Sequence, residues 1–500
     1  MLRNATFLTA MALTSAVMIW GIIDIAGLAT FADTTVRTLF QSRGWFVMLT
    51  VTILLVCCVV LALGPAGKIR LGADDDRPEF STFSWLSMMF AAGMGVGLLF
   101  YGVAEPMTHY NFMSQLMKPQ QAATNALSLT VFHWGFHAWA IYGLVGLVIA
   151  YFGFRHNKPQ LLSAPINAVF GKSWWAKPTG FVVDVLTIYA IAIGLAGSFA
   201  MGVFQAQSGI VRILGIADPG LPLSLIIFAV LFVAYLLPLM RDLGSGMATL
   251  SNTAIIITVT LLLYVLLAGP THFLMGTVVQ TMGVYITDFF PHGFAVYTFW
   301  DDTVQHWFSS WTLNYMAWWL AWAPFVGVFI ARISKGRTIR EFLAGVLLAP
   351  TGFSLLWFSI LGAMGFFQTY NQVYDPTIVQ TNINGSTFAL LETLPGATIT
   401  SLLTLTSALL FIITSVVSAA YVLAMFSVGG DQNPPTKMKL TWGAILGALG
   451  LIMILTDSIE AVKAIIALSA NPFVFIVLLL MVCLLKSLKM EAAKTKKGAE

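Results

Sequence analysis

Residues 82–102 read TFSWLSMMFAAGMGVGLLFYG, which has the length and low polarity of a membrane-spanning helix. Its centre holds glycine at alternate positions, Gly93, Gly95 and Gly97. Each glycine weakens a helix by roughly 1 kcal/mol relative to alanine. Unwound backbone persists inside a bilayer only where protein buries it or where it lines a cavity. The stretch therefore predicts a discontinuous helix of the kind that binds substrates and ions in transporters. The alternative is close helix packing through small residues.

The composition of the whole chain indicates the same lipid environment. Of its 500 residues, 58% are hydrophobic and only 9% are charged, whereas soluble domains carry about 25% charged residues. The net charge of +4, with no basic stripe outside short loops, gives no case for nucleic acid. Cys57, Cys58 and Cys483 all lie in apolar runs, so we expect neither a disulfide nor a metal site from them.

Twelve segments of about 20 mostly apolar residues predict twelve spans. They begin near residues 5, 45, 82, 126, 181, 221, 250, 308, 342, 400, 438 and 461. The first is interpreted as a retained span rather than a signal peptide, because its apolar run continues past Ile23 without a clear cleavage site. A further apolar stretch, from about Thr271 to Phe290, is interpreted as an amphipathic helix in the outer interface.

The basic residues predict how the chain is oriented. If both termini are cytoplasmic, 20 of the 25 Lys and Arg residues lie in cytoplasmic segments, as the positive-inside rule requires. We therefore expect a multi-pass protein of a bacterial-type inner membrane with both ends inside. The basic tail at residues 487–500 is interpreted as a positive-inside anchor, with a lipid-headgroup sensor as the alternative.

Tryptophans gather at the centres of two predicted spans, although tryptophan normally lies at the membrane interface. The eighth span holds Trp318, Trp319 and Trp322, followed by Pro324 and Gly327, which we expect to interrupt it. The fourth span offers three more rings, those of Trp134, Trp139 and Tyr142. Ring faces attract a cation by roughly 0.5–2 kcal/mol per contact. A quaternary ammonium has no N–H to donate, so six rings around one cavity would suit it; plain aromatic packing is the alternative.

A pair of hydroxyls, Thr414 and Ser415, lies in the tenth span. Together with carbonyls freed by the broken third span, they could supply hard oxygen ligands to Na⁺. The alternative is ordinary hydrogen bonding of each hydroxyl to its own helix.

Other polar residues in the apolar segments suggest no reaction chemistry. His133 and His137 have a spacing that can bind metal, but no acidic or cysteine partner is evident, so we interpret them as hydrogen-bonded structural residues. Asp24, Glu105 and Asp184 are interpreted as lying near span ends, with Glu105-Pro106 marking an outer helix end. We find no nucleophile, metal cluster or acid–base pair, so an enzyme is not expected.

Taken together, these motifs resemble the betaine/carnitine/choline transporter family over nearly the whole chain, and are closest to its sodium-coupled glycine betaine symporters. The glycine stretch continues as Gly97-Leu98 with Tyr101-Gly102 and Glu105-Pro106. The remaining matches are Phe132-His133-Trp134, Trp318-Trp319, Phe325-Val326-Gly327, the segment 331–341, Thr414-Ser415, Gly429-Gly430, Pro434-Pro435 and Trp442-Gly443.

The resemblance implies an all-α membrane protein of the LeuT type with twelve transmembrane helices. Two N-terminal helices and a cytoplasmic loop (1–80) would precede a first inverted five-helix repeat (81–270). An interfacial helix and connector (271–303) would lead to the second repeat (304–486) and the tail (487–500). It also implies a homotrimer without any cofactor other than the coupling ion.

The resemblance also implies which residues form the sites. The substrate would be held by Trp134, Trp139, Tyr142, Trp318, Trp319, Trp322, Gly95, Gly97, Ser198 and Phe325. One Na⁺ would be held by the carbonyls of Ala91 and Met94 together with Phe411, Thr414 and Ser415.

Departures from the family pattern refine the expected transport activity. Ile191 and Leu195 replace the hydroxyls that form a second sodium site in betaine members, so that site is in doubt. Choline carriers tend to have Asp where this chain has Gly97, so a zwitterion such as glycine betaine is favoured. The retained glycine stretch favours sodium symport, which would serve osmoprotection, over sodium-independent exchange. Choline, carnitine and sulfonium zwitterions such as dimethylsulfoniopropionate remain alternatives, while the central rings argue against a channel.

Overall fold

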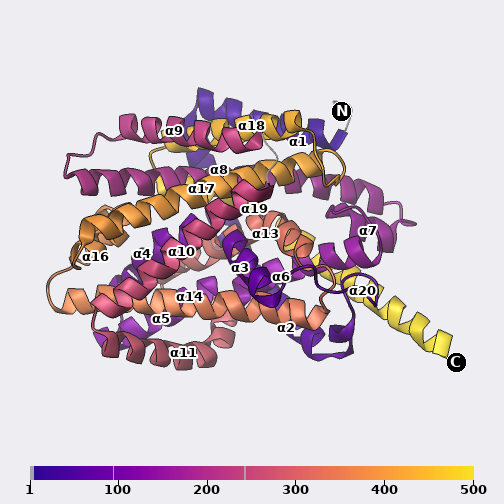
Figure 1. Ribbon diagram of the computed structural model, residues 1–500, viewed down its shortest axis with the longest axis horizontal. Helices are drawn as coiled ribbons and strands as arrows, with labels where there is room; N and C mark the ends of the chain where they lie inside the picture. Colours follow the sequence, from indigo (N-terminus) through magenta and orange to yellow (C-terminus); the bar gives the residue numbers. More distant parts are fainter. Residues whose placement is uncertain (1–4, 94, 241–243, 500) are drawn as a thin grey trace.

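The computed structural model describes residues 5–93, 95–240 and 244–499. Over these residues the chain is helical and contains no β-sheet, only an isolated bridge between Arg70 and Thr338 (Figure 1). The first half comprises α1 (Ala5–Ile23), α2 (Ile25–Leu63), α3 (Thr82–Gly93), α4 (Val96–Met113), α5 (Pro119–Trp134), α6 (Phe136–Ala150), α7 (Ser163–Phe170), α8 (Ala176–Leu214), α9 (Leu221–Leu239) and α10 (Gly244–Ala268).

The second half has the same all-helical character. It comprises α11 (Thr271–Phe294), α12 (Asp302–Phe308), α13 (Asn314–Arg332), α14 (Ile339–Tyr370), α15 (Ile378–Thr381), α16 (Ser386–Glu392), α17 (Ala397–Ser427), α18 (Thr436–Leu455), α19 (Ile459–Ala470) and α20 (Phe473–Ala499). In a bilayer the backbone polar groups must be satisfied within the segment, which is why a chain of this polarity folds into helices.

Twelve helical stretches in the described residues are long and apolar enough to cross a membrane. This agrees with the all-α class and the number predicted, but the two sets of twelve differ in one respect. The predicted third span is divided into α3 and α4, neither of which is long and apolar enough to cross a membrane by itself, whereas α11 is. Helix α11 packs against α5 and α14, and its placement in the outer interface stays a prediction.

Helix breaks occur where glycine interrupts an apolar run. Gly95 caps the start of α4, and Gly135 separates α5 from α6. The expected break at Pro324 is wrong, because α13 runs through it from Asn314 to Arg332. Membrane helices tolerate proline where neighbouring groups compensate for the missing hydrogen bond. The irregularity in this span lies earlier, in a π-helical turn at Ser309–Leu313.

The broken helices lie at the centre of the molecule. Helix α13 packs along α6 and also contacts α8, while α17 packs against α8 and α4. In Figure 1 the long helices run side by side, with α9 and α18 along one edge and α11 along the opposite edge. This arrangement buries the aromatic segments of α5, α6 and α13 far from the surface.

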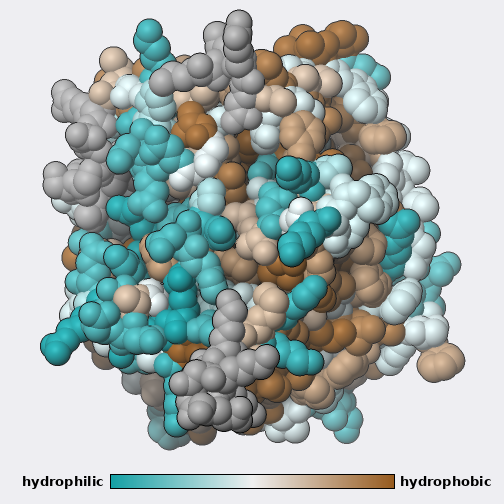
Figure 2. All heavy atoms as spheres, turned by 90° about the vertical axis from the view of Figure 1, so that its right-hand side faces the viewer, coloured by the Kyte–Doolittle hydropathy of each residue, from teal (hydrophilic) through white to brown (hydrophobic). Residues whose placement is uncertain are grey.

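Both ends of the chain lie on the same side of the molecule, on the right in Figure 1. Figure 2 shows this side, where hydrophilic residues cover much of the view and hydrophobic residues remain between and beside them. An even number of crossings would place the ends in this way, as the distribution of basic residues predicts.

Candidate functional site

An aromatic cavity lies where the broken third and fourth spans meet α8 and α13. It is lined by Gly95, Val96, Gly97, Trp134, Tyr142, Ser198, Tyr315, Trp318, Trp319 and Trp322. Eight of the ten predicted substrate residues are therefore together around one space. The cavity is narrow, with about 40 Å³ available to the centres of water-sized molecules.

The rings of this cavity hold one another edge to face. Trp319 is the central ring, with its centroid 5.3 Å from that of Trp134 and 5.1 Å from that of Tyr142. Tyr315 stacks on Trp318 at 6.3 Å and meets Trp134 edge-on at 5.6 Å. Such pairs are favoured by the ring quadrupole, and the same quadrupole gives a cation its attraction to the ring faces.

Two predicted substrate residues, Trp139 and Phe325, do not line the cavity. Trp139 is fully buried and packs edge-on against Tyr142 at 5.5 Å. Phe325 packs in the same way against Trp322 at 5.8 Å. Both therefore support a cavity ring from behind in this structure.

The cavity offers free N–H donors from two places, the first turn of α4 and the indole of Trp322. Helix α4 begins at Val96, so its first amide groups and the positive end of its dipole lie at the cavity. The Trp322 Nε1–H is buried and has no hydrogen-bond partner among the described residues. The Trp319 Nε1–H instead donates to the His133 carbonyl at 2.8 Å, and the Ser198 hydroxyl to the Gly194 carbonyl at 3.1 Å.

Gly97 allows the helix start to approach a ring. A Cβ at this position would lie 3.0 Å from Cη2 of Trp134, which is tighter than an ordinary van der Waals contact. Any side chain at residue 97 would thus press on a ring of the cavity. The close approach gives this glycine a packing role in addition to the charge argument made from sequence.

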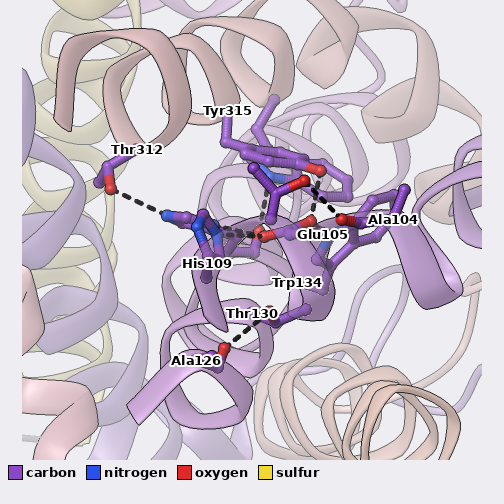
Figure 3. A network of polar contacts seen from close by, with 11 residues as sticks. Ala104, Glu105, His109, Ala126, Thr130, Trp134, Thr312 and Tyr315 are labelled. Carbon is purple, nitrogen blue, oxygen red and sulfur yellow. Dashed lines mark hydrogen bonds and ion pairs between the residues drawn. The ribbon is translucent and has the colours of Figure 1, made fainter. Parts of the chain in front are cut away.

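A buried hydrogen-bond network centred on Glu105 supports the cavity from one side (Figure 3). Oε2 of Glu105 accepts from Trp134 Nε1 at 2.9 Å and from the Tyr315 hydroxyl. Oε1 lies 2.6 Å from Nδ1 of His133 and 3.3 Å from Nε2 of His109. One carboxylate therefore orients two of the rings that line the cavity.

Several expectations about these polar residues are wrong. Glu105 does not mark a helix end, since α4 continues to Met113 with Pro106 inside it. His133 does have an acidic partner, and its other nitrogen lies 2.9 Å from the Thr312 hydroxyl. Neither ring nitrogen of His137 has a hydrogen-bond partner in the described part of the chain, so only His133 is the hydrogen-bonded residue predicted.

Glu105, His109 and His133 could in principle ligate a cation, because their ligand atoms lie within 4.8 Å of one another. However, Nδ1 of His133 and Oε1 of Glu105 already face each other at hydrogen-bonding distance. The sequence did carry one sign of this network, since Tyr101, Glu105 and His109 follow a spacing of four along one helix face. Tyr315 likewise lies four residues before Trp319, so these two rings share a face of α13.

The hydroxyl pair of α17 lies beside the break in the third span. Ser415 Oγ is 3.7 Å from the place of a Cβ on Gly95. The Thr414 hydroxyl donates to the carbonyls of Leu410 and Phe411, at 3.0 and 3.1 Å, which leaves its oxygen lone pairs available. Ala91 lies in the last turn of α3, and Met94 lies outside the described residues.

The position of the doubtful second sodium site is apolar. Ile191 and Leu195 are buried in α8, on the helix that also carries Gly194 and Ser198. Their side chains offer no ligand to a cation.

Comparison with known proteins identifies the family. The family model described as betaine/carnitine/choline family transporter matches residues 5–493. The glycine betaine transporter OpuD of Bacillus subtilis is 36% identical over 497 residues, covering 99% of this chain and 96% of that protein. An ectoine/hydroxyectoine transporter of Virgibacillus pantothenticus is 34% identical, over 91% of each chain. A glycine betaine/proline/choline/ectoine transporter of Vibrio parahaemolyticus is 36% identical, over 89% of this chain and 80% of that protein. The chain therefore belongs to the betaine/carnitine/choline family, whose members are membrane transporters rather than enzymes.

Proposed function

We propose that this protein imports glycine betaine, or a close zwitterionic analogue, by symport with Na⁺. The observation that carries the proposal is the cavity itself, which offers aromatic faces for a cation and unpaired N–H groups for an anion within one small space. A relative named as a glycine betaine transporter matches nearly the whole chain, which is consistent with this substrate class.

The rings suit the trimethylammonium end of the substrate. Trp134, Trp318, Trp319 and Tyr315 present a surface without a carboxylate, and the nearby Glu105 is engaged by its own donors. A quaternary ammonium loses little by leaving water for such a site, because it makes no directional hydrogen bonds and gains a cation–π contact with each ring.

The carboxylate end would bind at the start of α4. The amide groups at a helix N-terminus bind anions, and the Trp322 Nε1–H is an additional donor that the folded chain leaves without a partner. A buried donor without an acceptor costs roughly 1–3 kcal/mol. The substrate carboxylate would relieve that cost with a charged acceptor, whereas choline offers only the weaker, neutral oxygen of its hydroxyl.

Sodium would act through the break between α3 and α4. Carbonyls released by that break need partners where water is absent, and a cation held with the Thr414 and Ser415 hydroxyls would satisfy them. Because α4 also starts at the cavity, the ion would stabilise the backbone that binds the carboxylate. Substrate and ion affinities should then depend on each other reciprocally.

Uptake of labelled glycine betaine into proteoliposomes, with and without a Na⁺ gradient, tests the proposal. We expect saturable accumulation that requires Na⁺, and a Hill coefficient for Na⁺ near one since only one site is expected. Uptake that ignores Na⁺ would refute the symport, and a steep two-ion dependence would refute the single site. Carnitine, choline, ectoine, proline and dimethylsulfoniopropionate complete the panel, because relatives include carriers named for ectoine, proline and choline.

The double substitution Thr414→Ala with Ser415→Ala should raise the Na⁺ concentration for half-maximal uptake by about tenfold or more. This is the scale of one or two lost contacts to a charged group, about 1.5–3 kcal/mol each. Thr406→Ala is the matched control, because Thr406 is an exposed threonine of the same helix whose hydroxyl bonds to Leu402. Equal Na⁺ dependence in the double variant and the parent would remove these hydroxyls from the ion site.

Gly97→Asp should shift preference toward choline by about tenfold, measured as the ratio of choline to betaine inhibition constants in competition uptake. A carboxylate there would attract a net cation and repel the carboxylate of betaine. Gly97→Asn is the control, since it presses on Trp134 equally but adds no charge. If Asn produces the same shift as Asp, packing rather than charge controls the preference.

The homotrimer, the cytoplasmic location of both termini and a role in osmoprotection are part of the same proposal. They are supported by the motif resemblance and by the distribution of basic residues.

A further inference from the structure

A narrow neck lies between the aromatic cavity and a wide vestibule and shares lining residues with both. The neck is lined by Tyr101, Trp311, Tyr315, Trp318 and Lys463, among others. It shares Tyr315 and Trp318 with the cavity, and Lys463 with the vestibule. The vestibule offers about 580 Å³ to the centres of water-sized molecules and the neck only about 10 Å³. Substrate that enters from the vestibule must therefore pass Lys463.

The ammonium of Lys463 lies on ring faces in this neck. Its Nζ is 4.7 Å from the ring centroid of Trp311 and 5.7 Å from that of Tyr101. The Lys463 ammonium forms no ion pair with any residue that the structure describes. Its position in the second turn of α19 also places a positive charge near the positive end of that helix. Helix α19 thus holds the Lys463 ammonium in the neck without a counter-ion among the described residues and near the positive end of its own dipole, where a positive charge is disfavoured.

The surrounding charges do not neutralise this ammonium by contact. Glu460 lies exposed on the same helix, and Glu105 is buried behind the rings with its own donors. Asp33 and Arg37, which line the vestibule, pair with each other at 2.8 Å. A net cation that enters the neck therefore meets a fixed positive charge and ring faces that are already occupied.

We propose that Lys463 is a charge filter that admits zwitterions and rejects quaternary ammonium compounds with a net positive charge before they reach the aromatic cavity. The carboxylate of a zwitterion pairs with the Lys463 ammonium and draws it from Trp311 and Tyr101. The quaternary ammonium of the substrate then takes the vacated ring faces. Choline, or another quaternary ammonium compound without an anionic group, cannot make this exchange and is therefore repelled. This inference rests on the proposed function, because it assumes a zwitterionic quaternary-ammonium substrate.

Physical chemistry supports a filter of moderate strength. Two like charges about 5 Å apart in a partly hydrated site repel strongly enough to change relative affinities by about tenfold or more. Charged groups of this kind set specificity and entry rate more than final affinity. The discrimination due to Lys463 should therefore be visible when cation and zwitterion are compared in the same protein.

Lys463→Met tests the filter, because methionine keeps a long side chain and removes the charge. We expect the concentration of choline that halves labelled betaine uptake to fall about tenfold relative to the parent, while the KM for betaine rises. Lys463→Arg should retain the discrimination. Lys118→Met, at an exposed lysine outside the vestibule, controls for a change in total charge. Unchanged choline inhibition, or an equal change for choline and betaine, would overturn the filter.

Binding to purified protein provides a readout without transport. Quenching of tryptophan fluorescence by tetramethylammonium, a net cation of the same head group, should occur at about tenfold lower concentration in Lys463→Met than in the parent and in Lys463→Arg. Thermal unfolding of each variant establishes that it is folded. Equal tetramethylammonium binding in parent and Lys463→Met would refute the filter. A parent protein that accumulates no betaine would instead refute the proposed function, whatever the result with tetramethylammonium.

Discussion

Replacing Glu105 with alanine is expected to lower the free energy of unfolding by about 3–5 kcal/mol, the scale for removing one partner of a buried charged network. The substitution leaves four buried groups without their partner, namely the rings of His109 and His133, the Trp134 indole and the Tyr315 hydroxyl. Because two of those side chains line the cavity, substrate affinity should fall as well. Thermal unfolding in detergent and betaine titration by tryptophan fluorescence measure the two effects.

A matched carboxylate on the surface provides the control. Glu392 pairs with Arg212 at 2.8 Å and is partly exposed, and exposed pairs contribute only about 0–1 kcal/mol. Glu392→Ala should therefore leave both stability and affinity close to those of the parent. Glu105→Gln keeps the volume and one acceptor oxygen, so it should lie between the two. If Glu105→Ala is no less stable than Glu392→Ala, the Glu105 network does not stabilise the fold around the cavity.

Trp319→Leu is expected to weaken betaine binding by about 1–3 kcal/mol, the sum of a lost cation–π contact and lost apolar area. Trp319 is the ring that contacts both Trp134 and Tyr142, and its indole N–H is anchored to the His133 carbonyl. Removing it should therefore loosen the neighbouring rings as well as delete one face. Fluorescence titration or uptake competition with the purified, folded variant measures the change.

Substitutions of two other tryptophans distinguish a role in the cavity from a general effect of aromatic packing. Trp139→Leu removes a buried ring that supports Tyr142 without lining the cavity, so a smaller effect on affinity is expected. Trp174→Leu removes a ring that is 89% exposed and should have no effect on binding. Parent-like affinity in Trp319→Leu would show that the rings around the cavity do not hold the substrate.

The sequence predicted the glycine break and most of the cavity because both follow from local composition. Glycines at 93, 95 and 97 oppose a helix wherever they lie, and mid-membrane tryptophans are unusual whatever surrounds them. The position of the break beside α17 was also foreseeable, since freed carbonyls need a donor or a cation, and the hydroxyls of α17 can share a cation with them. The distance between Ser415 and Gly95 could not be predicted, because it depends on how α17 packs against α4.

What the sequence did not show depends on how helices rotate against one another. Helix α6 is apolar on all sides, so spacing alone could not tell that Tyr142 faces the cavity and Trp139 does not. The Glu105 network joins residues that are far apart in the chain, and only tertiary packing brings them together. The break predicted at Pro324 was wrong because the prediction used the local effect of proline alone. In a membrane, neighbouring groups can compensate for the hydrogen bond that proline removes, so α13 continues.

The corner between α5 and α6 is held by a residue from the edge of the molecule. The Phe136 N–H, freed by the break at Gly135, donates to the Tyr285 hydroxyl of α11 at 2.9 Å. The opposite face of α11 carries exposed apolar side chains, among them Val279 and Ile286. A push on that face would therefore be transmitted, through a single phenol, to the corner that lies next to Trp134.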